Sequence, residues 1–278
     1  MQISVESLSF AYTPTTRVLD DIDLSVDPGE SVVLAGPNGS GKSTLLKLLS
    51  GVLQANCGTI RFDRSPIEAL TARQLARRLA MVEQERSIGF DFTVREVVAM
   101  GRLPHRGRFS RESADDRRAI EQAMEFADVQ GFAQRSIRAI SGGERQRAYL
   151  ATALAQQPKI LLLDEPTTHL DLRHQVQFMS IVRQRVHDGM TVLTALHDLT
   201  LASQAADRIA LMANGRIAAI GRPDDVLSPY HVGHVFGVDA AIGEHPKLGT
   251  VYVLPVLGPQ SPSERRPNEP SPRSSSDA

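Results

Sequence analysis

The sequence predicts an α/β fold in which a mainly parallel sheet carries a helical insertion. Short, mostly apolar runs at residues 32–35, 160–163 and 191–196 are typical of strands that are buried on both faces of a parallel sheet. A glycine-rich loop and a helix at about residues 42–49 follow the first run, as expected for a strand–helix unit. From about residue 93 to residue 157 the pattern is helical, which indicates the insertion.

The flanking segments complete this prediction. Within the insertion, Ser113 and Asp116 have the spacing of a capping box, which marks a helix start. A further helix is expected from about Arg173. The other segments expected to be strands are 3–10, 18–26, 58–62, and the pair 209–212 and 216–220, which would form a hairpin turned at Asn214-Gly215.

The composition is that of an ordinary globular chain, since 41% of the 278 residues are apolar and 23% are charged. The net charge of -1 provides no overall basic field for nucleic acid or anionic lipid. Cys57 is the one cysteine, so no disulfide can form within the chain, which fits a reducing cytoplasm. We find no signal-peptide pattern and no run of roughly 20 apolar residues, so the chain is not expected to cross a membrane by itself.

The loop after the first apolar run fits the phosphate-loop pattern G-x-x-x-x-G-K-[ST]. Its glycines let backbone N–H groups point at phosphate oxygens, and the next helix adds the positive end of its dipole. Lys42 would bind the β and γ phosphates, and the Ser43 hydroxyl would bind Mg²⁺. A glycine-rich turn with an incidental lysine is the non-functional alternative. The residues are Gly36, Pro37, Asn38, Gly39, Ser40, Gly41, Lys42, Ser43 and Thr44.

Two acids, Asp164 and Glu165, end the apolar run at residues 160–163. A buried parallel strand delivers its last residues to the edge of the sheet where ligands bind. Asp164 is therefore suited to hold Mg²⁺, directly or through water, and Glu165 to act as the general base that polarises an attacking water. The alternative is a strand that simply ends in a polar turn.

A third segment, residues 140–147, has the sequence Ile-Ser-Gly-Gly-Glu-Arg-Gln-Arg. Ser141 is a natural N-cap, and the glycines leave backbone N–H groups open to a phosphate. With the two preceding motifs, this segment resembles the signature of the ATP-binding cassette family. The resemblance covers roughly residues 1–240. It implies that Ser141, Gly142, Gly143 and Glu144 of one copy face the γ-phosphate of an ATP that a second copy holds.

Other elements of that family occur in the same order. Tyr12 resembles the aromatic residue that stacks on adenine, and Gln84 resembles the glutamine whose loop senses Mg²⁺ and the membrane partner. Residues 168–171 resemble the segment that crosses the dimer interface, with Asp171 as its acid. His197 resembles the switch histidine that contacts the γ-phosphate. Each residue alone would more often be an ordinary packing or surface residue. Together they occur in the same order as in the family, and this supports the resemblance.

The resemblance implies a phosphate-loop NTPase core with a mainly parallel sheet, an antiparallel β subdomain and a helical insertion. Its nucleotide-binding domain would span residues 1–240, with a helical subdomain at about 93–157, and residues 241–257 would be a C-terminal extension. Residues 258–278 are rich in Pro, Ser and charge, so we expect a disordered tail. The implied cofactors are ATP and Mg²⁺, with the metal held by Ser43, Gln84 and Asp164 and catalysis by Lys42, Gln84, Glu165 and His197.

Residues 93–105, 235–237 and 245–246 resemble a subgroup that imports ferric siderophores, haem and cobalamin. This implies a homodimer under two permease subunits at the cytoplasmic face of the membrane, with a binding protein outside the cell membrane that delivers the ligand. We interpret one basic run either as a solvated loop or as a contact with a permease loop. It consists of Arg102, Arg106, Arg108 and Arg111.

The main alternative is a soluble cassette ATPase that acts on ribosomes or DNA. Such proteins usually carry two cassettes or a long coiled-coil insertion, whereas this sequence has one phosphate loop and no sustained heptads. A phosphate-loop kinase is disfavoured because residues 141–144 would then have no role. The identity of the ligand and of the permease does not follow from the sequence.

Overall fold

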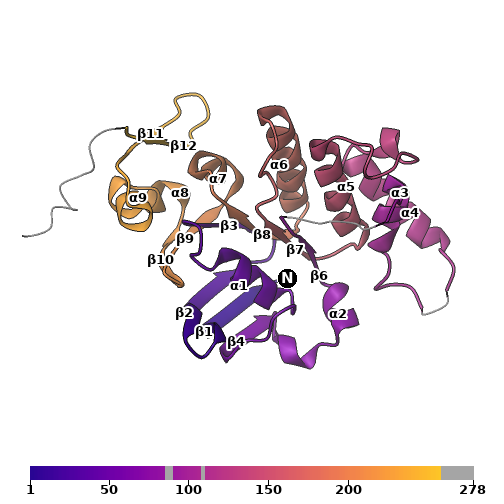
Figure 1. The fold of residues 1–278 in the computed structure, drawn as a ribbon, viewed down its shortest axis with the longest axis horizontal. Coiled ribbons are helices and arrows are strands. Elements are labelled where there is room, and N and C mark those ends of the chain that lie inside the picture. The colour runs from indigo at the N-terminus through magenta and orange to yellow at the C-terminus, as the bar shows by residue number, and fades with distance from the viewer. Residues whose placement is uncertain (85–89, 108–109, 258–278) are drawn as a thin grey trace, which may run out of the picture.

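The computed structural model describes residues 1–84, 90–107 and 110–257 (Figure 1). Its centre is a 6-stranded sheet with the strand order β10-β9-β3-β8-β7-β6. The strands from β9 to β6 run parallel to one another, and β10 pairs antiparallel with β9. These strands are β3 (Ser31–Ala35), β6 (Leu79–Val82), β7 (Ile160–Asp164), β8 (Thr191–Leu196), β9 (Arg208–Ala213) and β10 (Arg216–Gly221).

A second, antiparallel sheet has the order β2-β1-β4-β5, and helix α1 (Lys42–Leu49) packs between it and the central sheet (Figure 1). Side chains alternate along a strand, so Val32 and Leu34 of β3 face this core, whereas Val33 and Ala35 face a second core. The strands of the second sheet are β1 (Ile3–Thr13), β2 (Thr16–Val26), β4 (Cys57–Phe62) and β5 (Ser65–Pro66).

Helices α6 and α7 cover the face of the central sheet opposite α1, while α3, α4 and α5 pack together at one end of the molecule (Figure 1). At the other end lie α8, α9 and a hairpin of β11 (Ala240–Glu244) and β12 (Val251–Pro255). Among the described residues, no helix combines the length and the apolar character needed to span a bilayer. The helices are α2 (Ala72–Ala76), α3 (Val94–Met100), α4 (Ala114–Phe126), α5 (Gly142–Ala155), α6 (Leu172–His187), α7 (Leu199–Ala205), α8 (Pro223–Val226) and α9 (Pro229–Phe236), with 3-10 turns at Ile67–Ala69 and Gln130–Phe132.

The predicted fold class is confirmed. The capping box at Ser113 is also present, and the Ser113 hydroxyl accepts a hydrogen bond from the N–H of Asp116 at 3.1 Å. The predicted hairpin is also present, and both Asn214 (φ 50°) and Gly215 (φ 76°) are left-handed, as a type I′ turn requires. The sequence prediction missed strand β6, helix α2 and the C-terminal hairpin. The prediction of a tail at residues 258–278 falls outside the described residues.

The interpretation of Arg102 as part of an exposed basic run is wrong. Its side chain is buried, and it donates from Nε to Asp116 Oδ1 at 2.9 Å and from Nη1 to the Ala155 carbonyl at 2.7 Å. The guanidinium can be buried because its N–H groups find acceptors on both neighbouring helices. Arg102 therefore ties the end of α3 to the start of α4 and the end of α5. Arg108 lies outside the described residues, and Arg111 is exposed.

The Arg102–Asp116 pair predicts a stability change with pH. Burial, the largest influence, would raise the pKa of Asp116, but the hydrogen bonds from Arg102 and Ser113 outweigh it and lower the pKa from 3.8 to about 2. The ionised carboxylate therefore contributes about 2 kcal/mol, which is fully present above pH 4 and is lost as the pH falls towards 2. We expect the free energy of unfolding in urea to fall by about 2 kcal/mol more in the native chain than in Asp116→Asn over this pH range.

The neighbouring Asp115 provides a matched control, because its side chain is 77% exposed and pairs only with the exposed Arg118 among the described contacts. Asp115→Asn should follow the native pH profile. Identical profiles for Asp116→Asn and the native chain would contradict the role of the buried pair.

Candidate functional site

Neighbouring parallel strands bring the predicted site segments to one edge of the central sheet. The phosphate loop follows β3, His197 follows β8, Asp164 and Glu165 stand at the end of β7, and Gln84 comes shortly after β6. Because the carboxyl ends of parallel strands meet at the same edge, segments far apart in the sequence become neighbours here.

The phosphate loop is packed too closely against the core for larger residues at two positions. A Cβ at Gly36 would lie 2.2 Å from the Met212 carbonyl oxygen on β9, and a Cβ at Gly41 would lie 2.5 Å from Leu19 Cδ2 on β2. Gly41 also has a φ of 104°, which glycine adopts without strain. The pocket at this loop is lined by Val18, Asn38, Gly39, Gly41, Lys42, Ser43, Thr44 and Glu165.

Lys42 is buried in this loop with only 5% of its surface exposed. Its Nζ donates to the carbonyl oxygens of Gly36 at 2.9 Å and Pro37 at 3.0 Å. Burial lowers the pKa of Lys42, and the carboxylates of Glu165 and Asp164 counter that effect. The ammonium is thus partly removed from water and bonded to neutral carbonyls, so a phosphate would be a stronger partner than those it now has.

Ser43 and Asp164 form the part of the site that fits a hard cation. The Ser43 hydroxyl donates to Asp164 Oδ1 at 2.8 Å, and Asp164 is 4% exposed. Burial raises the pKa of Asp164, against the lowering effect of the Ser43 hydrogen bond. A hydroxyl and a buried carboxylate are ligands that suit Mg²⁺, which takes its other oxygens from phosphate and water. No cluster of three His, Cys, Asp or Glu ligands occurs in the described part of the chain.

Glu165 has an unusual backbone conformation, with a φ of 48°, directly after strand β7. A left-handed non-glycine residue at a site is often retained for its side-chain placement. The backbone N–H of Glu165 donates to the Ala195 carbonyl on β8 at 3.1 Å. Its carboxylate Oε1 pairs with His197 Nε2, and Oε2 accepts from Thr168 Oγ1 at 3.4 Å. Glu165 also lines the phosphate pocket, so the structure brings the predicted base and switch histidine together beside Lys42.

Ser141 caps helix α5 as predicted. Its hydroxyl accepts the Glu144 N–H at 3.3 Å, and its own N–H donates to Glu144 Oε2 at 2.7 Å. That bond from the Ser141 backbone is the largest influence lowering the pKa of Glu144. Among the described residues that line the phosphate pocket, none belongs to the segment 141–144. The structure thus does not bring this segment to Lys42 within one copy.

Three other predicted residues, Tyr12, Gln84 and Asp171, are not among the described residues that line the phosphate pocket. Tyr12 is exposed, its ring meets Phe10 edge-on at 4.9 Å, and its hydroxyl lies 3.4 Å from Thr44 Oγ1. Gln84 is exposed next to the segment that the structure does not describe. Asp171 caps helix α6, where hydrogen bonds from the backbone and side chain of His174 lower its pKa.

Residues 19–168 match the family model described as ABC transporter. The chain belongs to this family. This ABC transporter chain is 47% identical over 238 residues to the hemin import ATP-binding protein HmuV of Rhodococcus jostii. The alignment covers 86% of this chain and 81% of the relative. It is 41% identical over 242 residues to the cobalamin import ATP-binding protein BtuD of Halobacterium salinarum, covering 87% of the chain and 60% of that relative.

Solved structures agree with this assignment. A chain from an inward-facing ABC transporter described as being of the metal-chelate type has a TM-score of 0.81 at 26% identity, and the match covers 92% of this chain and 97% of that chain. The dimeric bacterial ABC transporter cassette MJ0796 has a TM-score of 0.71 at 26% identity, covering 80% of this chain and 98% of its own. The ABC transporter chain is therefore an ATP-binding protein and an ATPase whose hydrolysis is coupled to transport.

Sequence reasoning about this ABC transporter ATPase missed one residue that lies between two of its motifs. His174 caps nothing and belongs to no recognised pattern, yet its ring covers Gly143. Only the packing of α6 on α5 places the histidine against the signature segment.

Proposed function

We propose that this chain is the ATPase subunit of an importer for haem, cobalamin or a chemically related metal chelate such as a ferric siderophore. The observation that carries the proposal is the identity of 40 to 47% with ATP-binding proteins of hemin and cobalamin import over most of the chain. The segments at residues 93–105, 235–237 and 245–246 support the same subgroup.

The active unit in this proposal is a head-to-tail homodimer. Each phosphate pocket is lined by the phosphate loop, Val18 and Glu165 of the same copy and lacks the signature segment. Ser141 and Gly142 at the capped start of α5 are exposed, and the N-terminal end of this helix is suited to a phosphate. A second copy would therefore complete each site, and the existence of a dimeric structure for a related cassette supports a dimer.

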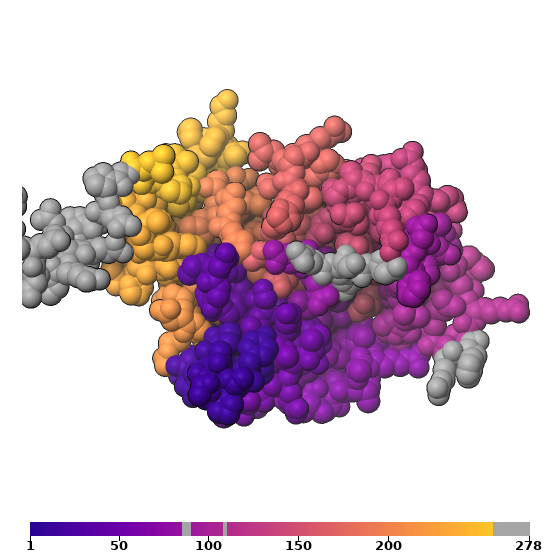
Figure 2. Space-filling model, in the orientation of Figure 1, coloured from indigo at the N-terminus to yellow at the C-terminus, as the bar shows by residue number. Residues whose placement is uncertain are grey.

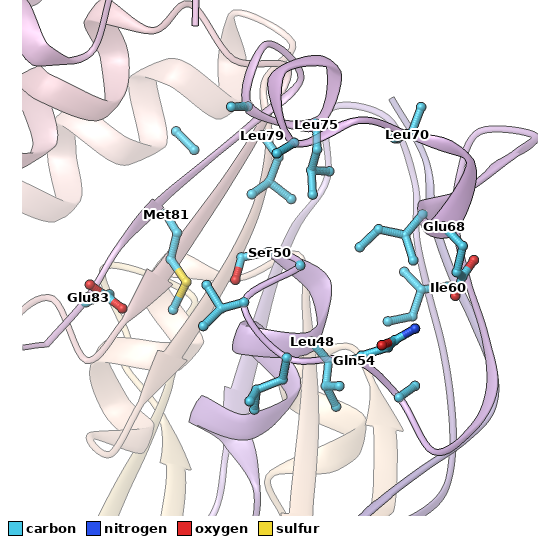
Figure 3. A pocket seen from close by; sticks show the side chains of 18 of the residues that line it. Leu48, Ser50, Gln54, Ile60, Glu68, Leu70, Leu75, Leu79, Met81 and Glu83 are labelled. Atoms are coloured by element: carbon cyan, nitrogen blue, oxygen red, sulfur yellow. The ribbon is translucent and has the colours of Figure 1, made fainter. Parts of the chain in front are cut away.

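The proposed permease contact is an apolar groove far larger than the phosphate pocket, with a volume of about 750 Å³ against about 130 Å³ (Figure 3). Figure 3 shows Leu48, Ile60, Leu75 and Leu79 around this groove. Met81, which lies three residues before Gln84 in the sequence, also lies there. An exposed apolar groove of this kind suits an amphipathic helix of a partner. A permease loop at this groove would hold the ATPase at the cytoplasmic face of the membrane as a peripheral subunit.

In the proposed mechanism, Lys42 leaves its two carbonyl partners and binds the β and γ phosphates of ATP. Mg²⁺, held by Ser43, Asp164 and Gln84, would supply positive charge to the phosphate oxygens. Glu165 accepts a proton from the attacking water, and His197 stabilises the charge that develops on the γ-phosphate. Closure of the dimer shields the site from bulk water while the attacking water is retained, and hydrolysis allows the dimer to open again.

Cells that lack this chain provide the test. They would be given iron-labelled haem, an iron-labelled ferric siderophore and cobalt-labelled cobalamin in separate assays. We expect the native chain to restore uptake of at least one ligand to the normal rate, and Glu165→Gln to restore less than about a hundredth of it. If deletion leaves the uptake of all three ligands unchanged, the chelate-import proposal is wrong. Co-purification with ribosomes instead of membranes would indicate the non-transport alternative.

A further inference from the structure

Helix α6 carries a histidine that packs directly on the signature segment. A Cβ at Gly143 would lie 2.5 Å from both Cγ and Cδ2 of the His174 ring. Gly143 is buried, while the residues on either side of it are at least partly exposed. The ring of His174 therefore covers the second glycine of the signature, and no larger residue fits there unless the ring moves.

The same histidine is bonded to the acid that precedes its helix. Asp171 Oδ1 accepts the backbone N–H of His174 at 2.9 Å and lies 2.8 Å from its ring Nδ1. Hydrogen bonds from His174 are the two largest influences that lower the pKa of Asp171. The ring thus fixes the orientation of an exposed carboxylate at one end and lies against Gly143 at the other.

A side-chain hydrogen bond also joins α5 to α6, about one helical turn beyond the contact of His174 with Gly143. The buried Arg147 of α5 donates from Nη1 to Gln177 Oε1 of α6 at 2.8 Å and from Nε to the Ala127 carbonyl at 3.1 Å. Gln177 in turn donates to Asp128 Oδ2 at 2.8 Å. Arg147 and Gln177 thus join α5 to α6 through hydrogen bonds that do not involve His174. Its position at the exposed ends of both helices points to another role.

We infer that His174 is a positioning residue that holds the signature segment and Asp171 of one copy in a fixed relation. Both segments then reach the ATP site of the second copy as one preformed surface. The inference rests on the proposed head-to-tail dimer. Two exposed segments that are ordered before association lose less conformational entropy when the dimer closes, so the closed state is favoured. His174 does not touch the nucleotide and acts through Gly143 and Asp171.

Two substitutions separate the contacts of His174. His174→Phe keeps a ring over Gly143 but has no donor for Asp171, whereas His174→Asn keeps a donor at the position of Nδ1 but has no ring. The backbone N–H that completes the cap of α6 remains in both. ATP-dependent dimer formation would be measured by sedimentation in a Glu165→Gln background, where the closed dimer is expected to persist. Each variant should raise the protein concentration for half-dimerisation about tenfold, a typical coupling between sites.

His187→Asn is the matched control, because His187 lies on the same helix with its side chain 86% exposed. It should dimerise like its Glu165→Gln parent. Binding of ATP to the single copy and the melting temperature without nucleotide should be unchanged in all variants, which a purely structural role would not give. Normal dimerisation of either His174 variant would overturn the inference. Failure of the Glu165→Gln parent itself to dimerise with ATP would instead refute the proposed dimer.

Discussion

Replacing Glu165 with glutamine is expected to leave ATP binding intact and to reduce ATP turnover by roughly 10²- to 10⁴-fold, the usual contribution of a general base. Glutamine has nearly the same shape as glutamate. It can still accept a hydrogen bond from Thr168 and contact His197, so the geometry of the pocket should persist. It cannot accept a proton from water. The change therefore removes the reaction step and retains the binding step, and steady-state ATPase assays with separate nucleotide-binding measurements would show the difference.

Glu125→Gln on α4 is a suitable control, because it makes the same chemical change at an exposed position. Its turnover should equal that of the native chain. Near-normal turnover in Glu165→Gln would remove Glu165 as the base and leave His197 as the nearest candidate. A large loss of ATP affinity in Glu165→Gln would show instead that the carboxylate helps the phosphate loop to bind ATP, by balancing the charge of Lys42.

The elements that could be predicted from the sequence are those whose signal is local. Strand β3 and helix α1 follow from an apolar run and the phosphate loop, and the turn at Asn214-Gly215 follows from two residues that tolerate positive φ. The site residues were predictable for a related reason. Asp164 and Glu165 stand at the end of β7 and His197 directly follows β8, and parallel strands place such residues at one edge of the sheet.

The features that could not be predicted depend on contacts between distant segments. Strand β6 has only 4 residues and no flanking turn signal, and it is recognisable as a strand chiefly through its pairing with β7. Arg102 looked like a surface residue because its acceptors, Asp116 and the Ala155 carbonyl, come from two other helices. The contact of His174 with Gly143 likewise exists only after α5 and α6 have packed together.

Replacing Lys42 with alanine is expected to abolish ATP binding at concentrations that saturate the native chain. Lys42 Nζ is held at the phosphate loop by two carbonyls and sits beside Asp164 and Glu165. Without this ammonium, the phosphates of ATP would face two carboxylates with no side-chain cation from the loop. Charge-assisted hydrogen bonds contribute about 1.5 to 3 kcal/mol each, so loss of two of them would weaken binding by at least about a hundredfold.

The measurement is the rise in melting temperature that ATP produces, because a ligand at 100 times its Kd stabilises the folded state by about 2.7 kcal/mol. Without nucleotide, Lys42→Ala should melt close to the native chain, since removing a desolvated charge offsets the loss of its two hydrogen bonds to the phosphate loop. It should gain nothing from ATP. Lys159→Ala, at an exposed lysine just before β7, should keep the full ATP response. An undiminished response in Lys42→Ala would mean that the backbone N–H groups and the dipole of α1 bind the phosphates without the lysine, and its role would then be confined to the hydrolytic step.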